Sequence, residues 1–225
     1  MGSPPVKGFG QGSPELALWA ESVFQPEDAV LREIRERSRA AGLPAIEVGA
    51  FDGRHLEVMA RAAGARRAVE IGTLGGYSGV CLLRGMGPEG LLHTFEREPR
   101  HVAVARQSFE RAGFARQVRL HLAPALEGLR AIEAEGPFDL VFVDADKRGY
   151  PDYLAWAESN LRLGGVFLAD NTFGFGHVHE PAPVGEDAAS MEALRRFALR
   201  LAQGGRFAAT MLPTAEGLAF GVKVR

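Results

Sequence analysis

The sequence predicts an α/β fold with a mostly parallel sheet and helices on both faces, and three observations support this. From Ala68 onward, five short apolar runs are each followed by a helical pattern, and strands that alternate with helices form parallel sheets. The runs are nearly all apolar, as expected of strands buried on both faces. Two last runs, 207–213 and 218–224, flank the sequence TAEG and predict a terminal hairpin.

The individual elements follow from periodicity and from their boundary residues. The pattern over 25–42 begins near Pro26 and acidic residues and closes at Gly42, which match the usual start and stop signals of a helix. The predicted helices before the sheet span 13–24, 25–42 and 53–64. The first five predicted strands span 68–72, 91–96, 118–122, 139–144 and 165–170, and a longer helix over about 186–203 precedes the hairpin.

Length and charge limit the functional classes. The chain has 225 residues, 46% of them hydrophobic and 24% charged, with a net charge of −2. It suits one domain and offers no basic field for nucleic acid or an anionic membrane. Cys81 is the one cysteine, so no internal disulfide is possible, and no apolar run approaches the roughly 20 residues of a membrane span. We expect a cytoplasmic protein.

The domain prediction separates a tail from a single domain. The Gly- and Pro-rich opening lacks the apolar centre of a signal peptide. We expect a flexible tail over 1–14 and one domain over 15–225. Within that domain, 15–64 should form a helical cap and 65–225 an α/β core.

The first strand ends in the glycine-rich sequence VEIGTLGGYSG. Glycines allow a ligand to approach the backbone closely, and in α/β sheets ligands bind beyond the carboxyl ends of the strands. The dinucleotide pattern G-x-G-x-x-G is absent, and Glu70 would repel a pyrophosphate. A ligand that carries an amine is favoured, although a turn that only reverses the chain stays an alternative.

The second and third strand ends suggest a nucleoside. Glu96 ends the second strand, where α/β nucleoside binders place an acid for the ribose hydroxyls. An exposed glutamate in the charged run EREPR is the alternative interpretation. Ala123 and Pro124 end the third strand, and a flat adenine could pack over them.

The fourth and fifth strand ends carry oxygen ligands. The sequence VDADK supplies Asp144, Asp146 and Lys147, and LADNT supplies Asp170 and Asn171. Neighbouring strands would bring two carboxylates and an amide together, a set that suits Mg²⁺. Asp146 and Lys147 could otherwise be solvated helix-cap residues.

These motifs resemble the metal-dependent, S-adenosylmethionine-dependent O-methyltransferases typified by the catechol and caffeoyl-coenzyme A enzymes. The resemblance covers 46–225 and is carried by VEIGTLGGYS, FVDADKRGYPDY and LRLGGVFLADNT. It implies a Rossmann-like class I methyltransferase fold with a seven-stranded sheet, a C-terminal antiparallel hairpin and extra N-terminal helices. It also implies a homodimer that methylates one hydroxyl of a catechol-type small molecule and releases S-adenosylhomocysteine.

The resemblance also assigns roles to individual residues. The positions implied to contact S-adenosylmethionine are Val48, Glu70, Gly72, Thr73, Gly76, Ser78, Glu96, Ala123, Asp144 and Asp146. Among these, Glu70 would hold the amino group, Glu96 the ribose hydroxyls and Ala123 the adenine. The implied ligands of Mg²⁺ or another divalent cation are Asp144, Asp170 and Asn171, and Lys147 matches the proposed general base. Asp144 and Lys147 are therefore the predicted catalytic residues.

The chemistry explains this combination of residues. Phenols ionise near pH 10, and a divalent cation acidifies a bound hydroxyl as a Lewis acid. We hypothesise that the metal orients and acidifies the acceptor while Lys147 completes the deprotonation. An S-adenosylmethionine-binding protein without catalysis and a nicotinamide-dependent oxidoreductase stay as alternatives.

Departures from the family pattern leave the acceptor open. Pro124 stands where relatives carry a polar residue, and Phe175 stands where plant coenzyme A ester enzymes have a substrate-contacting asparagine. A caffeoyl ester, a free catechol, a flavonoid and a bacterial secondary metabolite all stay possible.

Two further pairs of residues are not assigned to the predicted cofactor and metal site. His177 and His179 are predicted to be surface residues rather than a second metal site. Trp19 and Trp156 lie on apolar helical faces and are expected to pack in the core or a dimer interface.

Overall fold

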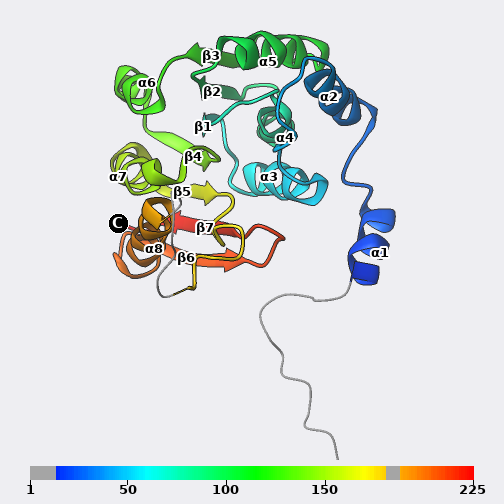
Figure 1. The fold of residues 1–225 in the computed structure, drawn as a ribbon. Helices are drawn as coiled ribbons and strands as arrows, with labels where there is room; N and C mark the ends of the chain where they lie inside the picture. Colours follow the sequence, from blue (N-terminus) through cyan, green and yellow to red (C-terminus); the bar gives the residue numbers. More distant parts are fainter. Residues whose placement is uncertain (1–13, 181–187) are drawn as a thin grey trace, which may run out of the picture.

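The computed structural model describes residues 14–180 and 188–225 and contains a seven-stranded sheet in the order β3-β2-β1-β4-β5-β7-β6 (Figure 1). Strands β1 to β5 are parallel, whereas β7 runs antiparallel to β5, and β6 antiparallel to β7. The strands are β1 (Arg67–Ile71), β2 (Leu91–Glu96), β3 (Val118–Leu122), β4 (Phe138–Val143), β5 (Leu161–Ala169), β6 (Phe207–Leu212) and β7 (Leu218–Lys223). The predicted α/β fold class and the terminal hairpin are confirmed.

The helices also fall near their predicted positions. They are α1 (Pro14–Phe24), α2 (Ala29–Ala40), α3 (Ala50–Ala62), α4 (Tyr77–Met86), α5 (Pro99–Arg111), α6 (Ala125–Ala131), α7 (Tyr150–Asn160) and α8 (Ala188–Gln203), with short 3-10 turns η1 (Glu133–Glu135) and η2 (Lys147–Gly149). The predicted start of α2 was too early, because Asp28 caps that helix by accepting a hydrogen bond from Leu31 N at 3.0 Å. Strand β5 begins earlier than predicted, because Leu161 pairs with Phe138 before a register shift.

Alternate residues of the central strands enter two separate cores. Val141 and Val143 of β4 pack into the core that includes α6, α7 and α8 residues, and Leu140 and Phe142 pack into the opposite core with α3 and α4 residues. Figure 1 shows these helix groups on either side of the sheet. The central strands are therefore mostly apolar because both faces are covered.

Helices α2 and α3 pack into the core on one face of the sheet, whereas α1 is exposed. Trp156 is 8% exposed and packs on Phe138 with ring centroids 5.5 Å apart, as predicted. Trp19 is 60% exposed, so it does not pack in the core, and packing in a dimer interface stays a prediction. The predicted flexible tail lies, except for Pro14, outside the described residues. No helix among the described residues is long and apolar enough to span a membrane.

Strand order reverses between β1 and β4, and the loops that follow these strands touch there. Gly72 follows β1 with φ +97°, and a Cβ at this position would lie 1.9 Å from the backbone oxygen of Asp144. Topological switch points of this kind are where α/β sheets bind ligands. The switch point therefore requires glycine at position 72.

Gly72→Ala should destabilise the fold by roughly 3 kcal/mol or more, because it adds a backbone clash to an unfavourable φ. Gly113→Ala is the matched control, since Gly113 has φ +84° with no atom within 4 Å of its ideal Cβ. In the control variant, the free energy of unfolding should fall by only about 1–2 kcal/mol, because only the backbone conformation is unfavourable. Urea unfolding of both variants measures the difference, and equal losses would contradict the proposed role of the contact.

Candidate active site

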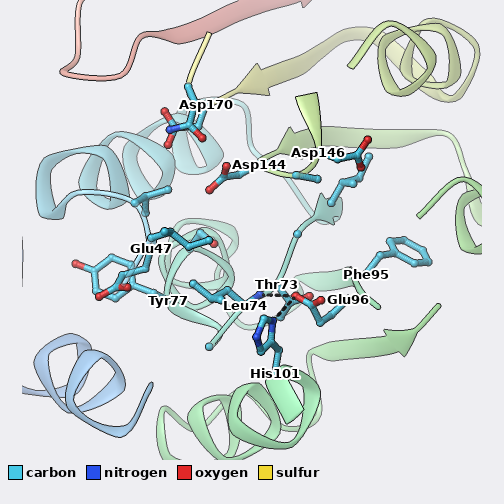
Figure 2. A pocket seen from close by; sticks show the side chains of 18 of the residues that line it. Glu47, Thr73, Leu74, Tyr77, Phe95, Glu96, His101, Asp144, Asp146 and Asp170 are labelled. Carbon is cyan, nitrogen blue, oxygen red and sulfur yellow. Dashed lines mark hydrogen bonds and ion pairs between the residues drawn. The ribbon is translucent and has the colours of Figure 1, made fainter. Parts of the chain in front are cut away.

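A cavity of about 900 Å³ lies at the carboxyl ends of β1, β2, β4 and β5 (Figure 2). It brings together most of the predicted site residues, which come from separate elements. The predicted residues that line it are Val48, Gly72, Thr73, Ser78, Glu96, Ala123, Asp144, Asp146, Lys147, Asp170 and Asn171. Glu70 and Gly76 do not line it.

Glu70 lies beneath the glycine loop rather than on the cavity wall. Its side chain is fully buried, and Ser78 Oγ and Thr94 Oγ1 each donate a hydrogen bond to it at 2.6 Å. Thr94 is its cross-strand neighbour on β2. Burial raises the pKa of Glu70 to about 7 in spite of these two donors. The predicted contact between Glu70 and an amine stays a prediction, and Ser78 is the partner that reaches the cavity.

Glu96 is held in a fixed orientation by backbone amides. Leu74 N donates to Glu96 Oε2 at 3.0 Å, while Arg97 N and Glu98 N donate to Oε1 at 2.8 and 3.0 Å. His101 Nδ1 lies 3.5 Å from Oε2, and Figure 2 shows Leu74 and His101 on the two sides of Glu96 that these contacts join. Three backbone amides therefore hold the Glu96 carboxylate at the cavity wall, unlike the freely exposed glutamate of the alternative interpretation.

Lys147 connects the ends of β4 and β5. Its Nζ donates to Asn171 Oδ1 at 2.7 Å and to Tyr150 OH at 2.8 Å, and lies 3.3 Å from Asp144 Oδ1. Tyr150 OH in turn donates to the backbone oxygen of Asp170 at 2.8 Å. The predicted convergence of these strand ends is thus observed.

Hydrogen bonds and the nearby lysine compensate the negative charges of Asp144 and Asp170 only in part. Asp170 is 3% exposed, and its Oδ1 is buried without a hydrogen-bond partner. Burial and then the Asp144 carboxylate raise the pKa of Asp170 to about 7. Burial also raises the pKa of Asp144 against the opposing effect of Lys147, and burial lowers the pKa of Lys147. A cation near these oxygens would relieve their mutual repulsion.

The oxygen atoms of Asp144, Asp170 and Asn171 fit a hard divalent cation. Among residues 14–180 and 188–225, no group of three or more His, Cys, Asp or Glu side chains is placed to hold a metal ion. The predicted ligand set differs from such a group, because it has two carboxylates and its third member, Asn171, contributes an amide oxygen. The unpartnered Oδ1 of Asp170 is the observation that supports a fit.

Asp146 lines the cavity but is also a cap residue. Gly149 N and Tyr153 OH donate to its two carboxylate oxygens at 3.0 and 2.7 Å. The alternative interpretation of Asp146 as a helix-cap residue is thus confirmed for its η2 turn, and the same side chain still contributes a carboxylate to the wall.

Sequence reasoning missed a polar clamp centred on Arg35 of α2. Arg35 Nη2 donates to Val48 O at 2.8 Å, Nη1 lies 2.9 Å from Glu47 Oε1, and the guanidinium sits 4.0 Å from the centre of the Tyr77 ring. Glu27 Oε1 accepts from Arg35 Nε at 2.5 Å and from Tyr77 OH at 2.8 Å. The clamp fixes Val48 in the cavity wall beside the glycine loop.

The segment 173–180, beyond the predicted ligands Asp170 and Asn171, contributes an aromatic side chain to the cavity. His177 and His179 are exposed, as predicted, and His177 Nδ1 lies 2.8 Å from Glu180 Oε1. Phe175 lines the cavity and is 63% exposed. Phe175 therefore adds an aromatic group to the lining of the cavity.

Comparisons with known proteins agree on one family. Residues 20–224 match a family model described as O-methyltransferase. A catechol O-methyltransferase of Mycobacterium tuberculosis is 44% identical over 70% of this chain and 71% of that protein. A catechol O-methyltransferase of Niastella koreensis is 35% identical over 83% of this chain and 84% of that protein. An O-methyltransferase of Bacillus cereus in complex with SAH superposes with a TM-score of 0.85 at 34% identity, covering 93% of this chain and 97% of that one.

Glu70→Gln should remove a pH-dependent component of stability. The pKa of Glu70 is about 7 in the fold against an ordinary 4.5, so between these values the folded protein holds a proton that the unfolded chain releases. The Glu70 contribution to the free energy of unfolding therefore falls as pH rises through this window, by up to about 3 kcal/mol. Urea unfolding at about pH 5 and about pH 8 measures this loss in the wild type relative to the variant.

Glu36→Gln is the control for this experiment, because Glu36 is an exposed carboxylate on α2. It should follow the wild-type pH profile. A Glu70→Gln profile parallel to that of the wild type would show that burial of Glu70 does not set the dependence.

Proposed function

The chain belongs to the O-methyltransferase family and is an S-adenosylmethionine-dependent enzyme, and from this premise we propose that it methylates one hydroxyl of a small catechol with the help of a divalent cation. The observation that carries the proposal is the convergence of Asp144, Asp170 and Asn171 with Lys147 in one cavity beside the glycine loop. The names of the two catechol O-methyltransferases support the acceptor class.

The cofactor half of the cavity is formed by the glycine loop and Glu96. S-adenosylmethionine supplies a methyl group that its sulfonium already activates. The carboxylate of Glu96, fixed by its amide donors, is suited to accept the two ribose hydroxyls. Ser78 and Thr73 present hydroxyls to the cavity for the amino-acid portion, and Ala123 provides a small surface for the adenine. Val48, held by Arg35, closes the wall.

The acceptor half is formed by the ends of β4 and β5. Asp144, Asp170 and Asn171 would hold the divalent cation, which when bound acidifies an acceptor hydroxyl as a Lewis acid. The unpartnered Oδ1 of Asp170 and the raised pKa values of both carboxyls support this assignment. These oxygens then orient the acceptor relative to the cofactor half.

Lys147 is proposed to remove the proton of the acceptor hydroxyl. A lysine accepts a proton only in its neutral form, and burial lowers its pKa and so favours that form. Asn171 Oδ1 and Tyr150 OH fix the position of Nζ. The proton is held at Lys147 Nζ after transfer.

We also propose a homodimer that uses α1. This helix exposes Leu18 and Trp19, at 66% and 60%, and Figure 1 shows it standing away from the sheet. An apolar helix surface of this kind is typical of a protein interface. Leu18→Asp with Trp19→Asp should shift the protein from dimer to monomer in sedimentation velocity. Leu199→Asp, at an exposed leucine on α8 (57%), should leave the dimer intact, and a wild-type monomer would refute the proposal.

Methyl transfer from S-adenosylmethionine to an uncharged catechol is the test of the function. The wild type should give methylated product with Mg²⁺, and EDTA should lower the rate by roughly 100-fold or more, because Lewis-acid stabilisation supplies several kcal/mol. Excess Mg²⁺ should restore the rate. Mass spectrometry of the product measures each rate.

Variants identify the residues responsible. Asp170→Asn should reproduce the effect of EDTA, and Lys147→Ala should lower the turnover with Mg²⁺ present. Asp152→Asn, at an exposed carboxylate on α7, should leave the rate unchanged. Methylation that survives EDTA would refute the metal mechanism and keep the methyltransferase. Cofactor binding without any product would favour the non-catalytic alternative.

A further inference from the structure

The carboxylate of Glu96 has few acceptor positions left for a ligand. Its Oε1 accepts hydrogen bonds from Arg97 N at 2.8 Å and from Glu98 N at 3.0 Å, and its Oε2 accepts one from Leu74 N at 3.0 Å. A carboxylate offers about four acceptor positions, two on each oxygen. The three amides therefore fill both positions of Oε1 and one of the two positions of Oε2.

The ribose of the cofactor carries two neighbouring hydroxyls, so it needs two hydrogen-bonding positions at this place. While the three amide bonds persist, Glu96 can accept a hydrogen bond from only one hydroxyl. The bond from Leu74 N is part of the glycine loop, in which Leu74 has φ +47°, a backbone conformation that a leucine rarely adopts. Because the Glu96 carboxylate stabilises this conformation, the second hydroxyl requires another group of the cavity wall.

His101 is placed to be that group. It is the third residue of α5, which begins with Pro99, and helical side chains lean toward the N-terminus of their helix, here toward the end of β2. Its Nδ1 lies 3.5 Å from Glu96 Oε2, and Figure 2 shows the ring beside that carboxylate. This separation exceeds the roughly 2.7–3.2 Å of a typical N–H···O hydrogen bond. His101 also lines the cavity, so its Nδ1 stands next to the acceptor position that Glu96 keeps open.

The side chains of the two residues that follow Glu96 are less suited to bind the second hydroxyl. Those of Arg97 and Glu98 are 75% and 56% exposed, and Arg97 Nε lies 3.9 Å from Glu98 Oε1. The side chain of His101 is only 19% exposed. A hydrogen bond in such an enclosed position is electrostatically stronger than one in contact with bulk water.

We propose that His101 shares the recognition of the ribose with Glu96, so that one hydroxyl donates to Glu96 Oε2 and the other forms a hydrogen bond with His101 Nδ1. This inference rests on the proposed function and divides between two residues a contact that the proposed function gives to Glu96 alone. A hydroxyl both donates and accepts, and an imidazole nitrogen does one or the other, so the bond forms whichever ring nitrogen carries the proton. His101 thus contributes to specificity for a cofactor with both ribose hydroxyls.

The test is calorimetric titration with S-adenosylhomocysteine and with its 2′-deoxy and 3′-deoxy analogues, in the absence of acceptor and divalent cation. In the wild type, loss of the hydroxyl that bonds the Glu96 carboxylate should raise Kd by roughly 10-fold or more, because a charged partner strengthens the bond. Loss of the hydroxyl that bonds the imidazole should raise Kd by roughly 3- to 10-fold.

His101→Phe keeps an aromatic ring and removes Nδ1. It should raise the Kd of S-adenosylhomocysteine by the same roughly 3- to 10-fold, because one hydroxyl loses its partner. The analogue that is less impaired in the wild type should bind His101→Phe and the wild type equally well, since it lacks the hydroxyl that His101 binds. The other analogue should show the full rise in Kd.

Two further variants serve as controls. His101→Asn keeps a hydrogen-bonding atom near the position of Nδ1 and should restore the wild-type pattern of Kd values for the three ligands. His177→Asn removes an exposed imidazole from the segment 173–180 and should leave all three Kd values unchanged.

An equal rise in Kd for all three ligands in His101→Phe would overturn the inference, because His101 would then act through packing and not through one hydroxyl. Unchanged binding of S-adenosylhomocysteine by His101→Phe, or a His101→Asn variant that matches His101→Phe, would overturn it as well. Each of these results would leave the proposed function standing as long as the wild type binds S-adenosylhomocysteine. A wild type that does not bind it would remove both.

Discussion

The fold and the site depend on one close contact, the approach of the β1 loop to the β4 loop where strand order reverses. The ideal Cβ of Gly72 would lie 1.9 Å from Asp144 O, so only a residue without a side chain allows it. The glycine loop and the carboxylate of Asp144 consequently share one cavity wall. The cofactor half and the acceptor half are brought together by backbone packing before any ligand is bound.

Burial of acidic groups around this contact couples stability to binding. Burial raises the pKa of Glu70, Asp144 and Asp170, which means that ionising these groups in the folded protein costs free energy. A bound cation would offset that cost, and a ligand that binds only the folded state stabilises it by mass action. The site therefore favours positively charged ligands, and the same acids weaken the protein without them.

The sequence predicted the strand-end residues because parallel strands place their carboxyl ends at one edge of the sheet. Glu96, Asp144 and Asn171 could be located in this way. Glu70 could not, because its place depends on which face of β1 it occupies, and it shares the α4 face with Ala68. Arg35 comes from the cap helix α2, whose approach to the sheet no local pattern encodes.

The two halves of the cavity differ in how firmly their polar groups are held. Backbone amides fix Glu96, and Arg35 fixes Val48, so the cofactor half is shaped in advance for one molecule. At the ends of β4 and β5, Asp170 keeps a buried Oδ1 without a hydrogen-bond partner, and its carboxylate interacts with that of Asp144 through charge. Charge falls off slowly with distance, whereas a hydrogen bond requires one geometry. The ends of β4 and β5 therefore favour a cation through charge, whereas the cofactor half has its polar groups already paired one by one.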